Sequence, residues 1–144
     1  MKNITAKSVP CDELLPRDLE IVHVEYSANF LTINIRSLSD SASTLVEFPH
    51  IIGFRVLDEG NLLEFWPDCS SANGRLFEIL AGGWLAQESV RPGILFAPMK
   101  IKAQEYFSQA WTTVFQLFVL ENRLSAEFPP RQQTGFPRFL VPHS

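Results

Sequence analysis

The sequence has few cysteines, and they are not arranged for metal or redox chemistry. Its 144 residues include only two, Cys11 and Cys69. These two lie far apart in the chain and lack the CxxC or Cys/His spacing of a metal or redox site. We therefore predict two unrelated reduced thiols, no metal site and no cofactor.

Long apolar runs and a basic charge excess are also missing. No stretch approaches the roughly eighteen consecutive apolar residues of a membrane span, and residues 1–7 contain no apolar core behind the lysine. The formal net charge is -4, the pI is about 5.3, and Lys and Arg are scattered singly. We expect a soluble, cytoplasmic protein that binds neither membranes nor nucleic acid.

Recognisable catalytic patterns are absent as well. Ser70-Ser71 lacks the GxSxG context of a nucleophile elbow, and Gly82-Gly83 lacks the context of a phosphate-binding loop. The three histidines stand near neither cysteine in any nucleophile or metal pattern; they are His23, His50 and His143. The sequence thus favours a protein that is not an enzyme.

What the chain does contain is enough apolar material for a packed core. Hydrophobic residues make up 46% of the sequence, and phenylalanine alone supplies twelve residues. The length fits one domain. We predict an N-terminal arm over residues 1–18, a single α+β domain over 19–120 and a proline-rich tail over 121–144.

Period-two alternation predicts a fold made mainly of antiparallel β-sheet, with one or two short helices. The clearest case is a hairpin of residues 19–26 and 30–36, in which Leu31, Ile33 and Ile35 share one face. We expect further strands at 44–48, 51–57, 76–80, 94–101 and 103–107. Residues 62–66 fit a short helix that Pro67 ends, and residues 84–91 fit a connector.

The central run Gly53-Phe54-Arg55-Val56-Leu57-Asp58-Glu59-Gly60-Asn61-Leu62-Leu63-Glu64-Phe65-Trp66, followed by Leu76-Phe77-Glu78-Ile79 and Gly82-Gly83-Trp84-Leu85, resembles a family of small bacterial proteins of unknown function. The resemblance covers about half of the chain. In that family, a segment similar to Glu105-Tyr106-Phe107 leads into a final strand of the type Thr-Gly-x-Asp-Asp-Cys-Val-Ser-Val. This chain departs from the family after Phe107.

The genetic code offers one explanation for this departure. The run Trp111-Thr112-Thr113, read in a frame displaced by two bases, gives a codon ending in TG, then Asp, then a codon that can encode Asp. With permitted codons, Ser108 to Leu120 then reads as the family's ending. Residues after about Phe107 are thus a candidate for a frameshifted tail. The alternative is that Thr113 to Leu120 forms the last strand.

The candidate site residues gather around the end of the central run. Asp58, Glu59 and Glu64 could act as acid and base or hold a cation, but acidic residues are also expected at the first turn of a helix. Arg55, on the preceding strand, can pair with one of them.

The aromatic residues of the matching segments divide into predicted core and predicted surface. We assign Phe54, Phe65 and Phe77 to the core by their burial preference. Trp66 and Trp84, beside Pro67 and Gly83, are the best candidates for a binding surface.

Three functional hypotheses follow. The first is a non-enzymatic protein-binding domain, the immunity partner of a bacterial toxin, in which Asp58, Glu59 and Glu64 would cover a basic site on the toxin domain. The second is a small-ligand-binding protein or an enzyme with a cleft formed by these acids, Arg55 and Trp84. The third is a homo-oligomer joined through exposed strand edges.

Overall fold

The chain forms two antiparallel sheets, as the computed structural model shows for residues 3–11, 15, 17–28, 30–58, 60, 62–94, 102–110, 113–120 and 138–140. The strands are β1 (Thr5–Ser8), β2 (Leu19–Ser27), β3 (Phe30–Ser37), β4 (Ser43–Phe48), β5 (Ile51–Asp58), β6 (Leu76–Ala81), β7 (Ala103–Gln109), β8 (Thr113–Leu120) and β9 (Arg138–Leu140). The helices are the 3₁₀ helix η2 (Leu63–Phe65), α1 (Trp66–Cys69) and α2 (Trp84–Glu88). The predicted antiparallel sheet with short helices is confirmed.

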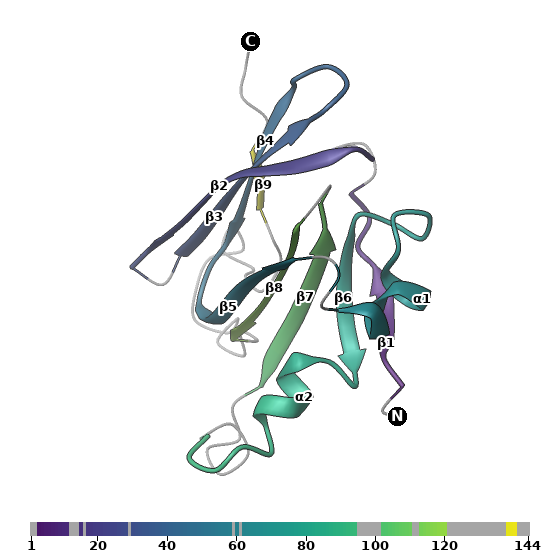
Figure 1. Cartoon of the computed structure of the whole chain (residues 1–144). Coiled ribbons are helices and arrows are strands. Elements are labelled where there is room, and N and C mark those ends of the chain that lie inside the picture. Colours follow the sequence, from purple (N-terminus) through teal and green to yellow (C-terminus); the bar gives the residue numbers. More distant parts are fainter. Residues whose placement is uncertain are drawn as a thin grey trace.

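One sheet has five strands in the order β1-β6-β7-β8-β5, and the other has four in the order β2-β3-β4-β9. Figure 1 shows the five-stranded sheet below the four-stranded one. The chain passes from the second sheet to the first at Pro49-His50, where His50 adopts a left-handed φ of 55°. Because β4 and β5 belong to different sheets, this turn sets the two layers against each other.

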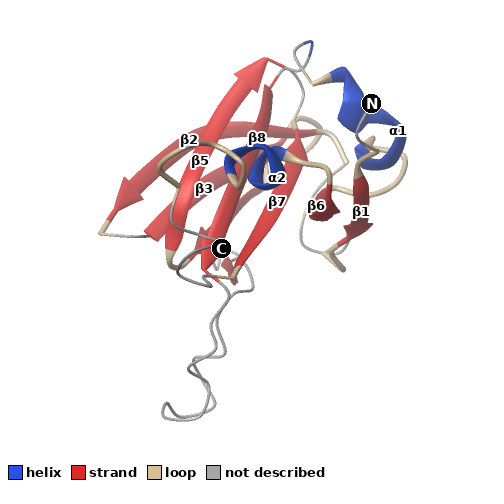
Figure 2. Cartoon of the chain, turned by 90° about the horizontal axis from the view of Figure 1, so that it is seen from below, coloured by secondary structure: helices blue, strands red, loops and turns tan. Residues whose placement is uncertain are grey.

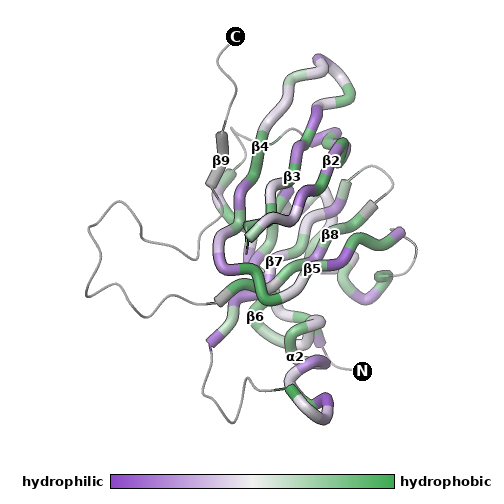
Figure 3. Tube along the Cα trace, turned by 90° about the vertical axis from the view of Figure 1, so that its left-hand side faces the viewer, coloured by the Kyte–Doolittle hydropathy of each residue, from purple (hydrophilic) through white to green (hydrophobic). Residues whose placement is uncertain are grey.

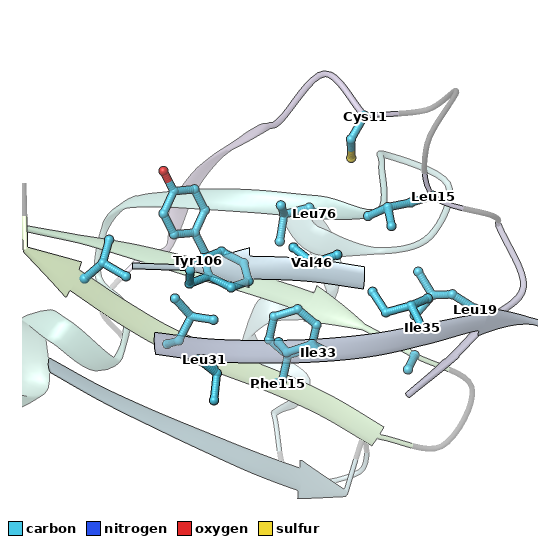
Figure 4. Packing of buried hydrophobic residues seen from close by; sticks show 14 of the residues in the cluster. Cys11, Leu15, Leu19, Leu31, Ile33, Ile35, Val46, Leu76, Tyr106 and Phe115 are labelled. Carbon is cyan, nitrogen blue, oxygen red and sulfur yellow. The ribbon is translucent and has the colours of Figure 1, made fainter. Parts of the chain in front are cut away.

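The two sheets enclose the larger hydrophobic core. From the four-stranded sheet come Leu31, Ile33, Ile35, Val46 and Phe48, and from the five-stranded sheet come Leu76, Tyr106, Phe115, Leu117 and Val119. Figure 4 shows Tyr106 and Phe115 lying against Leu31 and Ile33. We call the side of the five-stranded sheet that carries these residues its sandwich face. Alternation along β3 placed Leu31, Ile33 and Ile35 inward, as the sequence predicted.

The opposite side of the five-stranded sheet carries a second, smaller core, and we call it the helix face. Its members from β6, β7 and β8 are Phe77, Ile79, Phe107 and Val114, which pack against Leu62, Phe65 and Cys69 of the η2 and α1 region. The rings of Phe65 and Phe107 stack with centroids 4.7 Å apart. In Figure 2, α2 lies over β7 and β8, whereas α1 lies beside β1.

Four elements differ from the sequence predictions. Pro67 does not end the helical segment but lies in the first turn of α1, where proline is tolerated. β1 lies within the predicted arm and pairs with β6. The sequence did not predict this strand because the segment is short, mostly exposed and without a clear alternation of apolar residues. α2 occupies part of the predicted connector at 84–91. β9, which pairs with β4, lies within the predicted tail. The strand expected at 94–101 falls mostly outside the described residues.

The end of the predicted domain is an interior strand. β8 pairs with both β5 and β7 and carries Phe115, Leu117 and Val119 into the larger core. This is the arrangement expected if Thr113 to Leu120 is a regular strand of the fold. The displaced reading frame is a property of the gene and stays a prediction.

In the described part of the chain, no helix is long and apolar enough to cross a membrane. Glycine is required at Gly82, where φ is +78° and a Cβ would lie 2.4 Å from the carbonyl oxygen of Asn3. This close approach lets the start of the chain lie along the end of β6.

The position of β8 leads to a truncation test. A chain ending at Phe107 lacks the strand that joins β7 to β5 and should not unfold cooperatively, because both cores lose members. A chain ending at Leu120 keeps every strand that the structure describes except β9, and it should retain a cooperative thermal transition by circular dichroism. Cooperative unfolding of the shorter chain would contradict the topology.

Candidate functional site

The candidate residues from the central run lie on both faces of β5. Side chains alternate along a strand, so Arg55 projects to the helix face while Phe54, Val56 and Asp58 project to the sandwich face. Arg55 and Asp58 are therefore not neighbours on one face. Glu59 lies outside the described residues.

On the helix face, Arg55 is held by two groups from other elements. Its guanidinium donates from Nε to Gln116 Oε1 of β8 at 2.8 Å and also donates from Nη2 to the same oxygen. The guanidinium carbon lies 4.6 Å from the ring centroid of Trp84 in α2, a cation-π geometry. Two of the residues singled out in the sequence, Arg55 and Trp84, are thus in direct contact.

At the centre of this cluster is Glu105 of β7, a buried carboxylate only 1% exposed. It accepts hydrogen bonds from the backbone N–H of Trp84 at 3.0 Å and of Leu85 at 2.7 Å. Gln116 Nε2 donates to the same carboxylate at 2.9 Å. Glu105 therefore binds the first turn of α2 and fixes the orientation of Gln116. The side-chain oxygen of Gln116 in turn accepts the hydrogen bonds from Arg55.

The electrostatics of the cluster reflect burial and partial compensation. Burial raises the pKa of Glu105 above its ordinary value, although the N–H groups of Leu85 and Trp84, the charge of Arg55 and Gln116 act in the other direction. Burial likewise lowers the pKa of Arg55, against the charges of Glu105, Glu64 and Glu88. Each buried charge is thus stabilised by the other and by fixed hydrogen bonds.

The rim of the cluster lies on α2 and the residues that follow it. Trp84 Nε1 donates to Glu88 Oε1 at 3.2 Å, and Arg91 Nε donates to Glu88 Oε2 at 2.6 Å. The pKa of Glu88 is lowered mainly by the hydrogen bond from Arg91, against burial, which acts to raise it, and with a further contribution from the Trp84 bond. Trp84 is thus held at both its ring face and its N–H.

Of the remaining candidates, Glu64 acts on Arg55 through its charge, whereas Asp58 and Trp66 stand apart from this cluster. Asp58 Oδ1 accepts from the N–H of Gly60 at 2.9 Å and so forms the turn after β5. Glu64 is exposed in the first turn of η2 and makes no capping hydrogen bond there. Trp66 is half-buried at the start of α1, which packs against β1 and β7. Arg55 bonds Gln116, and its predicted pairing with one of the acids of the central run stays a prediction.

The predicted fates of the phenylalanines are partly wrong. Phe65 and Phe77 are buried, as predicted, but Phe54 is 39% exposed. Its neighbour on the same face, Val56, is 42% exposed, and Tyr26 of β2 is 53% exposed. The Tyr26 and Phe54 ring centroids lie 6.0 Å apart. Burial preference failed here because β2 and β5 are the outer strands at this side of the two sheets.

The cysteines of this chain are not placed as reactive nucleophiles. Neither cysteine forms a disulfide, and the two are buried in different cores. Burial, together with the charges of Asp68 and Glu105, raises the pKa of Cys69 to about 12, so its thiol stays protonated at neutral pH. Among the described residues, no group of three or more His, Cys, Asp or Glu side chains is placed to hold a metal ion.

Glu105 caps α2 by accepting hydrogen bonds from its first two N–H groups, and we call this contact the Glu105 cap. The cap leaves no room for a side chain at Gly83. Its φ of -84° is open to any residue, but a Cβ would lie 2.6 Å and 2.7 Å from the carboxylate oxygens of Glu105. Gly83→Ala should therefore displace the carboxylate and lower the unfolding free energy by about 2 kcal/mol. Urea unfolding measures this loss.

Gly60→Ala is the matched control for this test. A Cβ at Gly60 would approach only Asp58 Oδ1, at 3.2 Å, and Asp58 is exposed and able to move. We expect a change within about 0.5 kcal/mol. Equal effects of the two substitutions would show that the Glu105 cap is not what Gly83 accommodates.

Comparisons with known proteins leave the family open: no family model, no curated protein and no solved structure matches this chain. The resemblance of the central run to a bacterial family therefore stays a prediction. The residues that carry it nonetheless meet in space, since Arg55 contacts Trp84, Phe65 stacks on Phe107, and Glu105 binds Leu85.

Proposed function

We propose that this protein is a non-enzymatic protein-binding domain, and that its partner is basic, as expected of the immunity partner of a bacterial toxin. The observation that carries the proposal is the solvent-exposed contact between Tyr26 and Phe54. Aromatic residues at a protein surface anchor interfaces at low cost in conformational entropy. We call Tyr26, Phe54, Val56 and Asp58 the β5 surface.

The β5 surface has the composition of a small interface. Its centre is apolar and its end is acidic, because Asp58 follows Phe54 and Val56 on the same face of β5. The chain also carries a net charge of -4, which attracts a basic partner at long range. Asp58 in this view contributes mainly to the rate and salt dependence of association, and the rings contribute to affinity.

The ligand-cleft hypothesis has less support from the geometry. It requires Arg55, Trp84 and the acids of the central run in one site, but Asp58 lies on the opposite face of β5 from Arg55. Arg55 and Trp84 are already bonded to Gln116 and Glu88. These contacts favour a role of the helix face in holding the fold together.

The test is the affinity of the purified chain for the product of the neighbouring gene, measured by titration calorimetry. Phe54→Ser should weaken binding at least about tenfold, because it removes an aromatic anchor at the centre of the surface. Val90→Ser is the control, since Val90 is 76% exposed but lies in the turn after α2. Absence of binding by the unmodified chain, or equal weakening by both variants, would contradict the proposal.

A further inference from the structure

The side of the molecule formed by β2 and β5 presents two outer strands, one from each sheet (Figure 3). Within the described part of the chain, β8 is the only strand that pairs with β5. An outer strand directs half of its backbone N–H and C=O groups away from its own sheet, and these groups can pair with another chain. β5 therefore offers backbone recognition in addition to the side chains of the β5 surface.

β5 is regular over the length that such pairing needs. Its only irregularity lies between Ile51 and Gly53, and from Gly53 to Asp58 it keeps an unbroken register with β8. Exposure along this run follows the strand period, since Phe54, Val56 and Asp58 are exposed while Arg55 and Leu57 are half-buried. Every second residue of an added strand would lie beside one of these three exposed side chains.

β2 is less suited to the same role. A bulge interrupts its pairing between Ile21 and His23, and a bulge bends the strand and breaks the repeat of its free backbone groups. Its outer residues also include Glu20, which Arg36 already pairs at 2.7 Å. Bulges and charges are devices by which proteins protect edge strands. From Gly53 to Val56, β5 has no bulge, and its one charged side chain, Arg55, projects to the helix face and bonds Gln116.

We propose that the partner binds by adding an extended segment antiparallel to β5, with apolar residues beside Phe54 and Val56 and a Lys or Arg beside Asp58. The proposal rests on the proposed function and specifies its binding mode. All strand pairs described in this protein are antiparallel, so the added strand continues the same pattern. A second copy of the chain is disfavoured as the occupant, because both copies carry a charge of -4.

The test uses a synthetic peptide and amide hydrogen exchange of the full chain by NMR. In acetyl-Lys-Thr-Val-Thr-Val-Thr-amide, antiparallel addition places the Lys beside Asp58 and the two Val beside Val56 and Phe54. Saturating peptide should slow exchange of backbone amides between Gly53 and Asp58. The same peptide with Glu in place of Lys should bind about two- to fivefold more weakly.

Three results would overturn strand addition. They are a peptide that does not bind, protection that appears on β2 but not on β5, and equal binding of the Lys and Glu peptides. Failure of the strand-addition mode can be distinguished from failure of the proposed function. If binding of the neighbouring-gene product depends on Phe54 but leaves the β5 amides unprotected, the β5 surface is an interface and the strand-addition mode is wrong.

Discussion

The burial of the Glu105 carboxylate is the interaction on which the arrangement of the helix face depends. An isolated buried carboxylate is costly, so the structure must supply partners for it. It does so with two backbone N–H groups of α2 and the side-chain amide of Gln116. Because these donors come from α2 and β8, satisfying one carboxylate places α2 on the sheet and orients Gln116 towards Arg55.

This dependence separates the two faces of the five-stranded sheet by role. On the helix face the polar groups bind one another: Arg55 contacts Gln116 and Trp84, and Trp84 donates a hydrogen bond to Glu88. The sandwich face is closed over most of its area by the four-stranded sheet. It is open beside β5, where Phe54, Val56 and Tyr26 are exposed. The proposed interface lies on this open side, and the buried polar cluster maintains the sheet behind it.

The sequence predicted those features that are local. Alternation in residues 30–36 identified β3 and its buried face, because the strand has one wet side and one apolar side. It did not reveal β1, whose four residues are mostly exposed, nor α2, whose first turn is bound by a residue twenty positions away in the chain. Phe54 was misassigned because whether β5 is an outer strand depends on strand order, which no local pattern encodes.

The candidate site was predicted in its members but not in its geometry. Arg55 and Trp84 were both singled out, yet their contact joins segments separated in the chain by two short helices and one strand, β6. Glu105 was missed as a polar centre. A signal for it was present, since Glu105 directly precedes the aromatic residues Tyr106 and Phe107 in the strand. An acidic residue in such a strand must find donors, but the sequence does not show where they come from.

The most direct test of this division of roles is Glu105→Gln, followed by urea unfolding and by calorimetry with the neighbouring-gene product. The substituted amide presents a donor where Glu105 accepts from Trp84, Leu85 and Gln116, so we expect a loss of about 2 kcal/mol in unfolding free energy. The affinity of the folded variant should stay within about twofold of the unmodified chain. Unchanged stability, or a tenfold loss of affinity in a folded variant, would contradict the account.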